Sequence, residues 1–113
     1  MIFTDYGKSL MWLDIVGKAN AFGATLSIVD SESNELALVL MPNPIQQSIT
    51  GGKLVFNTIP KSLVLRSGTP VLAHMIIGSV IAFSLTVGVD LILEKPSLQA
   101  GGYLNIESLS ITI

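Results

Sequence analysis

The sequence predicts an all-β fold, namely an antiparallel β-sandwich of jelly-roll or immunoglobulin-like type with a short N-terminal helix. Short segments rich in Val, Ile, Leu, Phe and Thr follow Gly23, and these residues favour a pleated surface. Clusters of Gly, Pro, Asp, Asn and Ser separate the segments at intervals of roughly 8 to 12 residues, which indicates about eight strands. We therefore assign residues 1–22 to a helical segment packed on the sandwich and residues 23–113 to the sandwich domain.

The N-terminal helix has its own start and stop signals. Thr4 or Asp5 provides an N-cap, but Gly7 costs about 1 kcal/mol inside a helix and favours a start only near Lys8. Stop signals follow at Gly17, Asn20 and Gly23. Trp12 is expected to be the main anchor of the helix on the sheet. Apolar residues recur at helical spacing and predict the buried stripe, namely Tyr6, Leu10, Leu13 and Ile15 or Val16.

The strands are predicted from alternation and from the turns that bound them. In the segment 35–40, Leu36, Leu38 and Leu40 are expected to share one face. Two prolines in the segment 41–52 predict a connection there rather than a central strand. The complete set of expected strands is 24–29, 35–40, 53–57, 62–66, 70–77, 80–87, 89–93 and 103–113.

The composition limits the function classes. The chain is 50% hydrophobic and 12% charged, with a mean hydropathy of +0.67, whereas an ordinary soluble domain carries about 25% charged residues. Such a chain must lie in a bilayer or bury extra surface against partners. The net charge of −2 and the scattered Lys and Arg residues disfavour nucleic-acid binding, because neutralising phosphates needs clustered cations, so we predict no nucleic-acid partner. Cysteine is absent, which removes disulfides, thiolate chemistry and cysteine-based metal sites. No secretory signal is visible at the N-terminus, so we expect synthesis in a cytoplasm.

The uncharged window from Ser67 to Val89 is long enough for a transmembrane helix, which needs about 20 mostly apolar residues. Its composition favours strands instead, because Gly and Pro interrupt it and β-branched residues dominate the rest. Neither end carries the Trp or Tyr that is typical of a membrane interface. We predict an antiparallel hairpin with a tight turn at Gly78-Ser79, and a small membrane protein is the less favoured alternative.

Both faces of this hairpin are apolar, and strands that are apolar on both faces are buried on both faces. In a small domain with one core, the second face has to meet another molecule. The sequence therefore predicts a homo-oligomer, a trimer or larger. The residues expected at the contact are Leu72, His74, Ile76, Val80 and Ala82.

Acidic residues in the turn DSESNE resemble the opening of a calcium loop, with Asp30, Glu32 and Asn34 at alternate positions. An EF-hand loop needs Gly at its sixth position and Glu at its twelfth, where this chain has Glu35 and Met41. The sequence therefore predicts a solvated hairpin turn and no metal site.

Other candidate chemical groups lack partners. His74 is the only histidine, and no neighbouring serine has the context of an activated nucleophile, so a hydrogen-bonded strand histidine is expected. Asp90 and Glu94 raise the idea of a paired-carboxylate glycosidase site, but solvated carboxylates at a strand end are favoured. We predict no enzyme, no catalytic residue and no cofactor.

The order of motifs resembles a group of small structural proteins of tailed bacteriophages. The stretches GATLSIVDSESNELALVL, GGKLVFN, SGTPVLAH, LTVGVDLIL and LQAGGYLNIESLSITI carry the resemblance, from about Gly23 onward. The group has a polar, charged turn in the hairpin, where this chain has the apolar Met75-Ile76-Ile77 before Gly78-Ser79.

This resemblance implies a non-enzymatic virion protein that acts by subunit assembly, as a capsid decoration or as a tail or baseplate component. Its partners would be other virion proteins and copies of itself, and its location the virion. A carbohydrate-binding β-sandwich for host attachment is the alternative. That class needs exposed aromatic platforms, and the candidates are Trp12, Tyr6 and Tyr103, in a chain that is only 6% aromatic.

Overall fold

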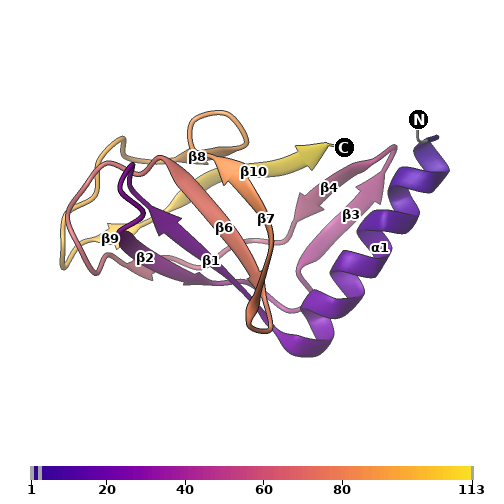
Figure 1. The fold of residues 1–113 in the computed structure, drawn as a ribbon, viewed down its shortest axis with the longest axis horizontal. Coiled ribbons are helices and arrows are strands. Elements are labelled where there is room, and N and C mark those ends of the chain that lie inside the picture. The colour runs from indigo at the N-terminus through magenta and orange to yellow at the C-terminus, as the bar shows by residue number, and fades with distance from the viewer. Residues whose placement is uncertain (1, 3, 113) are drawn as a thin grey trace.

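The computed structural model describes residues 2 and 4–112, and in them the chain forms one helix and ten strands (Figure 1). The strands pair antiparallel in two four-stranded sheets and one two-stranded sheet, so the prediction of a mostly β protein with one N-terminal helix is confirmed. Met1, Phe3 and Ile113 lie outside the described residues. The elements are α1 (Asp5–Phe22), β1 (Ala24–Val29), β2 (Glu35–Leu40), β3 (Gln46–Thr50), β4 (Lys53–Phe56), β5 (Ser62–Leu63), β6 (Leu72–Ile77), β7 (Val80–Thr86), β8 (Leu91–Leu93), β9 (Tyr103–Leu104) and β10 (Ile106–Thr112).

The first sheet has the strand order β2-β1-β6-β7. A register shift between β1 and β2 lies near the start of β2, so that Leu36 and Ala37 are both buried although they are consecutive. Leu38 and Leu40 consequently point outward on the other side of the sheet. The prediction that Leu36, Leu38 and Leu40 share one face is therefore wrong, because a β-bulge reverses the alternation.

The uncharged window 67–89 forms the predicted hairpin. β6 and β7 pair antiparallel from Leu72 opposite Thr86 to Ile77 opposite Val80, and Gly78 takes a positive φ of 65° in the turn. A register shift in the middle of the hairpin leaves Ala82 as the extra residue of β7. Within residues 2 and 4–112, no helix combines the length and the apolar character that a membrane crossing requires.

The second sheet has the order β3-β4-β10-β8, and it contains a strand that the sequence did not predict. The connection expected over residues 41–52 is wrong for Gln46–Thr50, which form β3. Pro42 and Pro44 precede this strand, and β3 lies at the sheet edge, so neither proline removes a hydrogen bond from the ladder.

Two predicted strands are shorter than expected. The segment 62–66 contributes Ser62–Leu63 as β5, and the closing segment 103–113 is interrupted at Asn105. Its first two residues form β9, which pairs with β5, while β10 continues into the second sheet. Because of this interruption, the segment 103–112 contributes one strand to the two-stranded sheet and another to the second four-stranded sheet.

Helix α1 begins at the predicted cap. Thr4 Oγ1 accepts a hydrogen bond of 3.1 Å from the backbone N–H of Gly7, and the helix starts at Asp5. The start expected near Lys8 is therefore wrong, because the cap satisfies a free N–H in the first turn and offsets the cost of glycine there.

The helix ends at Gly23, the last of the three predicted stop signals. Gly23 has a φ of 82°, a conformation that glycine tolerates, and its N–H donates to Ala19 O at 2.9 Å. Gly17 and Asn20 lie inside the helix instead. The Asn20 side chain accepts from the Ile45 N–H at 2.9 Å and so fixes the segment before β3.

Trp12 anchors the helix as predicted. Its indole is 3% exposed, donates to Gly52 O at 2.8 Å, and meets Phe83 edge-on with ring centroids 5.8 Å apart. Val16 and Ala19 share this buried face. The predicted buried stripe is wrong for Tyr6, Leu10 and Leu13, which are all exposed.

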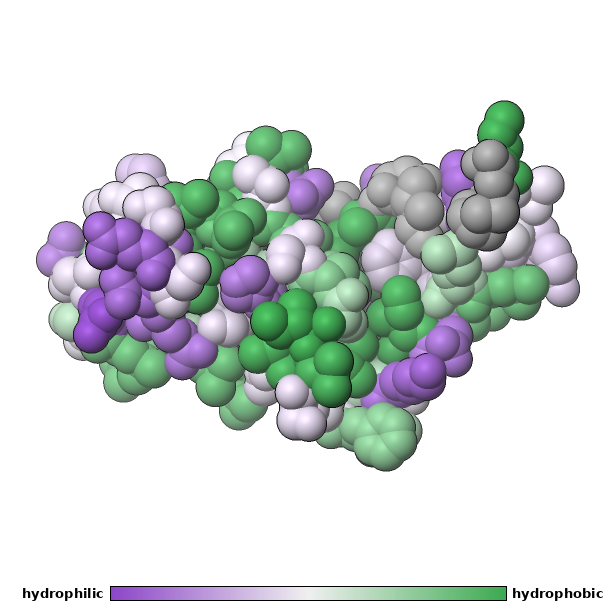
Figure 2. All heavy atoms as spheres, viewed as in Figure 1, coloured by the Kyte–Doolittle hydropathy of each residue, from purple (hydrophilic) through white to green (hydrophobic). Residues whose placement is uncertain are grey.

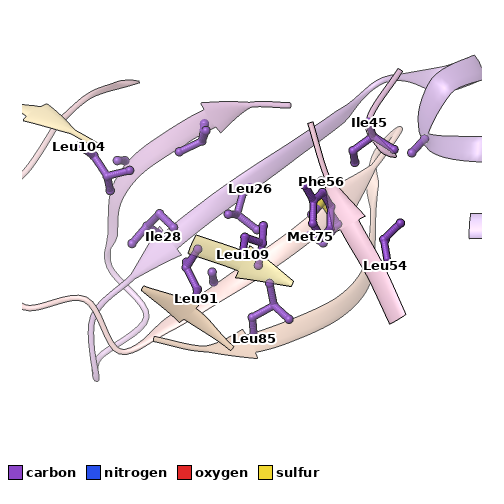
Figure 3. Packing of buried hydrophobic residues seen from close by; sticks show 14 of the residues in the cluster. Leu26, Ile28, Ile45, Leu54, Phe56, Met75, Leu85, Leu91, Leu104 and Leu109 are labelled. Carbon is purple, nitrogen blue, oxygen red and sulfur yellow. The ribbon is translucent and has the colours of Figure 1, made fainter. Parts of the chain in front are cut away.

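One apolar core holds the elements together (Figure 3). Both four-stranded sheets and the helix contribute side chains to it, so neither sheet buries its apolar face alone. Figure 3 labels members from β1, β4, β6, β7, β8, β9 and β10 around this core, including Leu26, Ile28, Leu54, Phe56, Met75, Leu85, Leu91, Leu104 and Leu109.

Candidate interaction surfaces

The five residues predicted for subunit contact lie on two sides of the β6–β7 hairpin. Leu72, His74 and Ile76 alternate with residues of the core side and occupy the outer face of the first sheet. Val80 and Ala82 are exposed but line a groove between the hairpin and α1. The bulge at Ala82 produces this separation, because it shifts the alternation of β7 by one residue. The structure thus brings together three of the five predicted residues.

The outer face of the first sheet is less uniformly apolar than the hairpin sequence suggests. His74 Nδ1 lies 2.6 Å from Ser84 Oγ on the opposite strand, and Ser27 Oγ donates to a Glu35 carboxylate oxygen at 2.6 Å. Figure 2 shows that apolar surface gathers at the turn end of the hairpin. The predicted hydrogen bonding of His74 is confirmed, and its place at an interface stays a prediction.

A first exposed apolar surface lies beside β2. Its side chains converge from β2 and from the segment that contains β5, and all are between 40% and 67% exposed. We call this surface the leucine groove and define it by Leu38, Leu40, Leu63 and Leu65. Tyr103 extends it, because this residue pairs with Leu63 across β5 and β9 and is itself exposed.

Local strand geometry turns these leucines outward. Val39 and Val64 are buried, so the residues on either side of each must point to solvent. An antiparallel bridge between Ala37 and Val64 then brings the two segments side by side. An exposed apolar patch of a few hundred Å² is often the functional surface of a protein, so the leucine groove is a candidate interaction site.

The second apolar surface lies on α1. Tyr6, Leu10 and Leu13 follow one another at positions i, i+4 and i+7 and are 75%, 49% and 55% exposed. We call these three residues the helix stripe. Trp12 and Val16 are buried on a neighbouring side, so the apolar surface of the helix extends beyond the part that the core covers.

The leucine groove and the helix stripe differ in the charges beside them. Lys61 is the charged residue among those lining the leucine groove. Asp14 follows the helix stripe, and its side chain is 69% exposed and lies 3.3 Å from Lys18 Nζ. The Asp14–Lys18 pair is exposed and of i,i+4 type, so it holds Asp14 only weakly.

The acidic turn is a structural element, as predicted. Asp30 Oδ1 accepts hydrogen bonds of 2.9 Å from the N–H groups of Asn34 and Glu32. The backbone hydrogen bond from Asn34 is the largest cause that lowers the pKa of Asp30 below its ordinary value of 3.8. The carboxylate therefore serves the turn between β1 and β2.

The two carboxylates considered for glycoside chemistry each have a separate structural partner. Asp90 Oδ2 accepts the Thr86 N–H at 2.9 Å, and Glu94 Oε2 accepts the Asn105 amide at 2.8 Å. Of the aromatic residues considered as sugar platforms, Trp12 is buried, and Tyr6 and Tyr103 lie on different elements.

A polar recess lies where β4 and β10 diverge. Its lining includes Asn57, Thr58, Asn105 and Glu107. Glu107 is the one ionisable side chain in that lining, so the recess does not pair a general acid with a base.

Sequence reasoning missed both the leucine groove and the helix stripe as exposed surfaces. The alternation Leu63-Val64-Leu65 was a usable signal for the groove, because one of its two faces has to be solvent-facing. For the helix, Trp12, Val16 and Ala19 form a competing stripe at i, i+4 and i+7, and the largest of these side chains decides which face is buried.

Comparison with protein-family models, with curated proteins and with solved structures gives no match for this chain.

Proposed function

We propose that this protein is a structural subunit that acts by self-assembly, as a component of a bacteriophage virion. The observation that carries the proposal is the amount of apolar surface outside the core. The leucine groove and the helix stripe are both exposed, on a chain with only 12% charged residues. Burying such surfaces against other subunits gains about 25 cal/mol per Å² before the entropy of association is subtracted.

The resemblance of the segment from Gly23 onward to small structural proteins of tailed phages supports the virion as the place of assembly. In that setting the protein decorates a capsid or forms part of a tail or baseplate. The hairpin residues predicted at the contact, Leu72, His74, Ile76, Val80 and Ala82, belong to the proposed assembly surfaces as well.

We also propose that the finer architecture is a β-sandwich of jelly-roll or immunoglobulin-like type. The support is that the sheets β2-β1-β6-β7 and β3-β4-β10-β8 contribute to one common core, with α1 packed beside it through Trp12. A sandwich leaves the outer face of each sheet available for neighbouring subunits.

Two measurements test the proposal. Light scattering coupled to size-exclusion chromatography should give a homo-oligomer, a trimer or larger, and a monomer at all protein concentrations would refute self-assembly. Peptide mass spectrometry on purified particles should detect the protein. A copy number near that of the major capsid protein identifies decoration and a much lower one a tail or baseplate, whereas absence from particles would refute the virion assignment.

A further inference from the structure

We propose that the helix stripe of one copy docks into the leucine groove of the next, so that the subunits assemble head to tail. This inference rests on the proposed function, because it names the contact through which self-assembly occurs. The two surfaces belong to opposite parts of the fold. Figure 1 shows the N-terminal half of α1 at one end of the molecule and β2 and β9 toward the other, along a longest dimension of 42 Å.

The shapes of the two surfaces are complementary. The helix stripe is convex, and its residues at i, i+4 and i+7 have the spacing by which amphipathic helices fill apolar grooves. The leucine groove is a concave surface, bounded by Pro60 and Ser62 as well as by its leucines. A convex helix and a concave groove fit each other, whereas two concave grooves leave a gap between them.

The exposed areas of the two surfaces are of the same order. A large apolar side chain offers about 200 Å² when fully exposed. On that basis the groove with Tyr103 offers on the order of 500 Å², and the helix stripe offers on the order of 350 Å². Their sum is about 900 Å² before flanking residues are counted, which is the size of a weak, reversible protein contact.

The charges favour docking of the helix stripe into the leucine groove over a contact between two grooves. A groove-to-groove contact brings two Lys61 side chains together, and like charges across an interface select against it. Docking of the helix stripe into the groove instead offers Lys61 the Asp14 carboxylate of the next copy, which its own Lys18 holds only weakly.

A contact between two different surfaces repeats from copy to copy. It closes into a ring when the rotation between neighbours divides a full turn, and otherwise it continues as a filament. Either product contains more subunits than a symmetric dimer. The inference therefore agrees with the proposed trimer or larger assembly.

The test uses two substitutions of exposed leucines, Leu13→Lys in the helix stripe and Leu40→Lys in the leucine groove. Each is expected to weaken self-association at least tenfold in sedimentation equilibrium. An equimolar mixture of the two variants is expected to form a 1:1 heterodimer that grows no further through this contact, because one intact stripe and one intact groove remain.

Matched controls separate docking from general effects of an added lysine. Met11→Lys changes an exposed apolar residue of the same helix outside the stripe, and Val89→Lys changes one in the turn before β8. Both should assemble like the unmodified chain. Leu10→Lys and Leu63→Lys provide second variants should either test protein have a lowered melting temperature.

The outcomes distinguish this inference from the proposed function. If the unmodified chain assembles and either test variant assembles equally well alone, or if the mixture stays monomeric, head-to-tail docking is overturned while self-assembly stands. If the unmodified chain is monomeric throughout, both are overturned.

Discussion

The indole N–H of Trp12 donates a 2.8 Å hydrogen bond to the carbonyl oxygen of Gly52, and this contact joins the N-terminal helix to the turn between β3 and β4. Gly52 is buried, so its carbonyl oxygen depends on the indole for a partner. The contact links residues that are 40 positions apart in the chain. It thereby fixes the helix against one edge of the second sheet and leaves the helix stripe facing outward.

We expect Trp12→Phe to lower the free energy of unfolding by about 1–3 kcal/mol, because an apolar ring of smaller size leaves the buried Gly52 carbonyl unpaired. The edge-on contact with Phe83 remains possible for phenylalanine. Urea unfolding followed by circular dichroism measures the change. Tyr6→Phe is the control, since Tyr6 is exposed and its substitution should stay within about 0.5 kcal/mol. Equal stability of Trp12→Phe and the unmodified chain would contradict the anchoring role.

The hydrogen bonds of Asp30 predict a pH-dependent effect of Asp30→Ala. The folded-state pKa of Asp30 is lowered, first by the backbone hydrogen bond from Asn34, so the ionised carboxylate stabilises the folded chain. This contribution is complete at pH values above the ordinary pKa of 3.8 and disappears as the pH falls through the lowered folded-state pKa. The variant should therefore be less stable than the unmodified chain at pH 7 and approach it in strong acid. A stability difference that does not change with pH would show that the turn does not depend on the ionised carboxylate.

Gly17 and Gly52 lie in different environments, so replacing each by alanine should change the stability of the fold in opposite directions. Gly17 lies inside α1, and a Cβ there would meet nothing within 4 Å, so Gly17→Ala should stabilise the fold by up to about 1 kcal/mol. Gly52 has a φ of 79°, and a Cβ there would lie 2.7 Å from Lys8 Cδ, so Gly52→Ala should destabilise it by about 1 kcal/mol or more. Thermal unfolding of both variants provides the comparison. Stabilisation of both, or of neither, would contradict this assignment of their environments.

The sequence predicts much of the first sheet because its turns carry strong local signals. Asp30 and Asn34 mark one turn and Gly78-Ser79 another, and the strands between them extend over the expected residues to within two positions. Outer and inner faces are harder to predict, because a β-bulge reverses the alternation and has no clear signature in one sequence. The bulge in β2 turns Leu38 outward, and the one at Ala82 separates Val80 from Ile76.

The buried face of the helix is a second feature that the sequence alone does not predict. Two apolar stripes at helical spacing compete for the core, and periodicity alone does not rank them. Trp12 decides the outcome through a bond to Gly52, a long-range contact that no local pattern contains. β3 was missed for a related reason, since the prolines before it suggest a loop and its place at a sheet edge is a property of the whole fold.

Exchanging the charges of Lys61 and Asp14 tests the docking of the helix stripe into the leucine groove. Lys61→Glu should weaken self-association by about three- to tenfold, because it replaces an attraction toward Asp14 of the neighbouring copy by a repulsion. The double variant Lys61→Glu with Asp14→Lys should recover most of the lost affinity, since each contact again joins opposite charges. Sedimentation equilibrium at low salt measures both, and high salt should reduce the difference between the variants because exposed charges are screened. Asp14→Lys also breaks the contact with Lys18, so the melting temperature of each variant is measured alongside. A double variant that assembles more weakly than Lys61→Glu alone would contradict the pairing of these two residues across the contact.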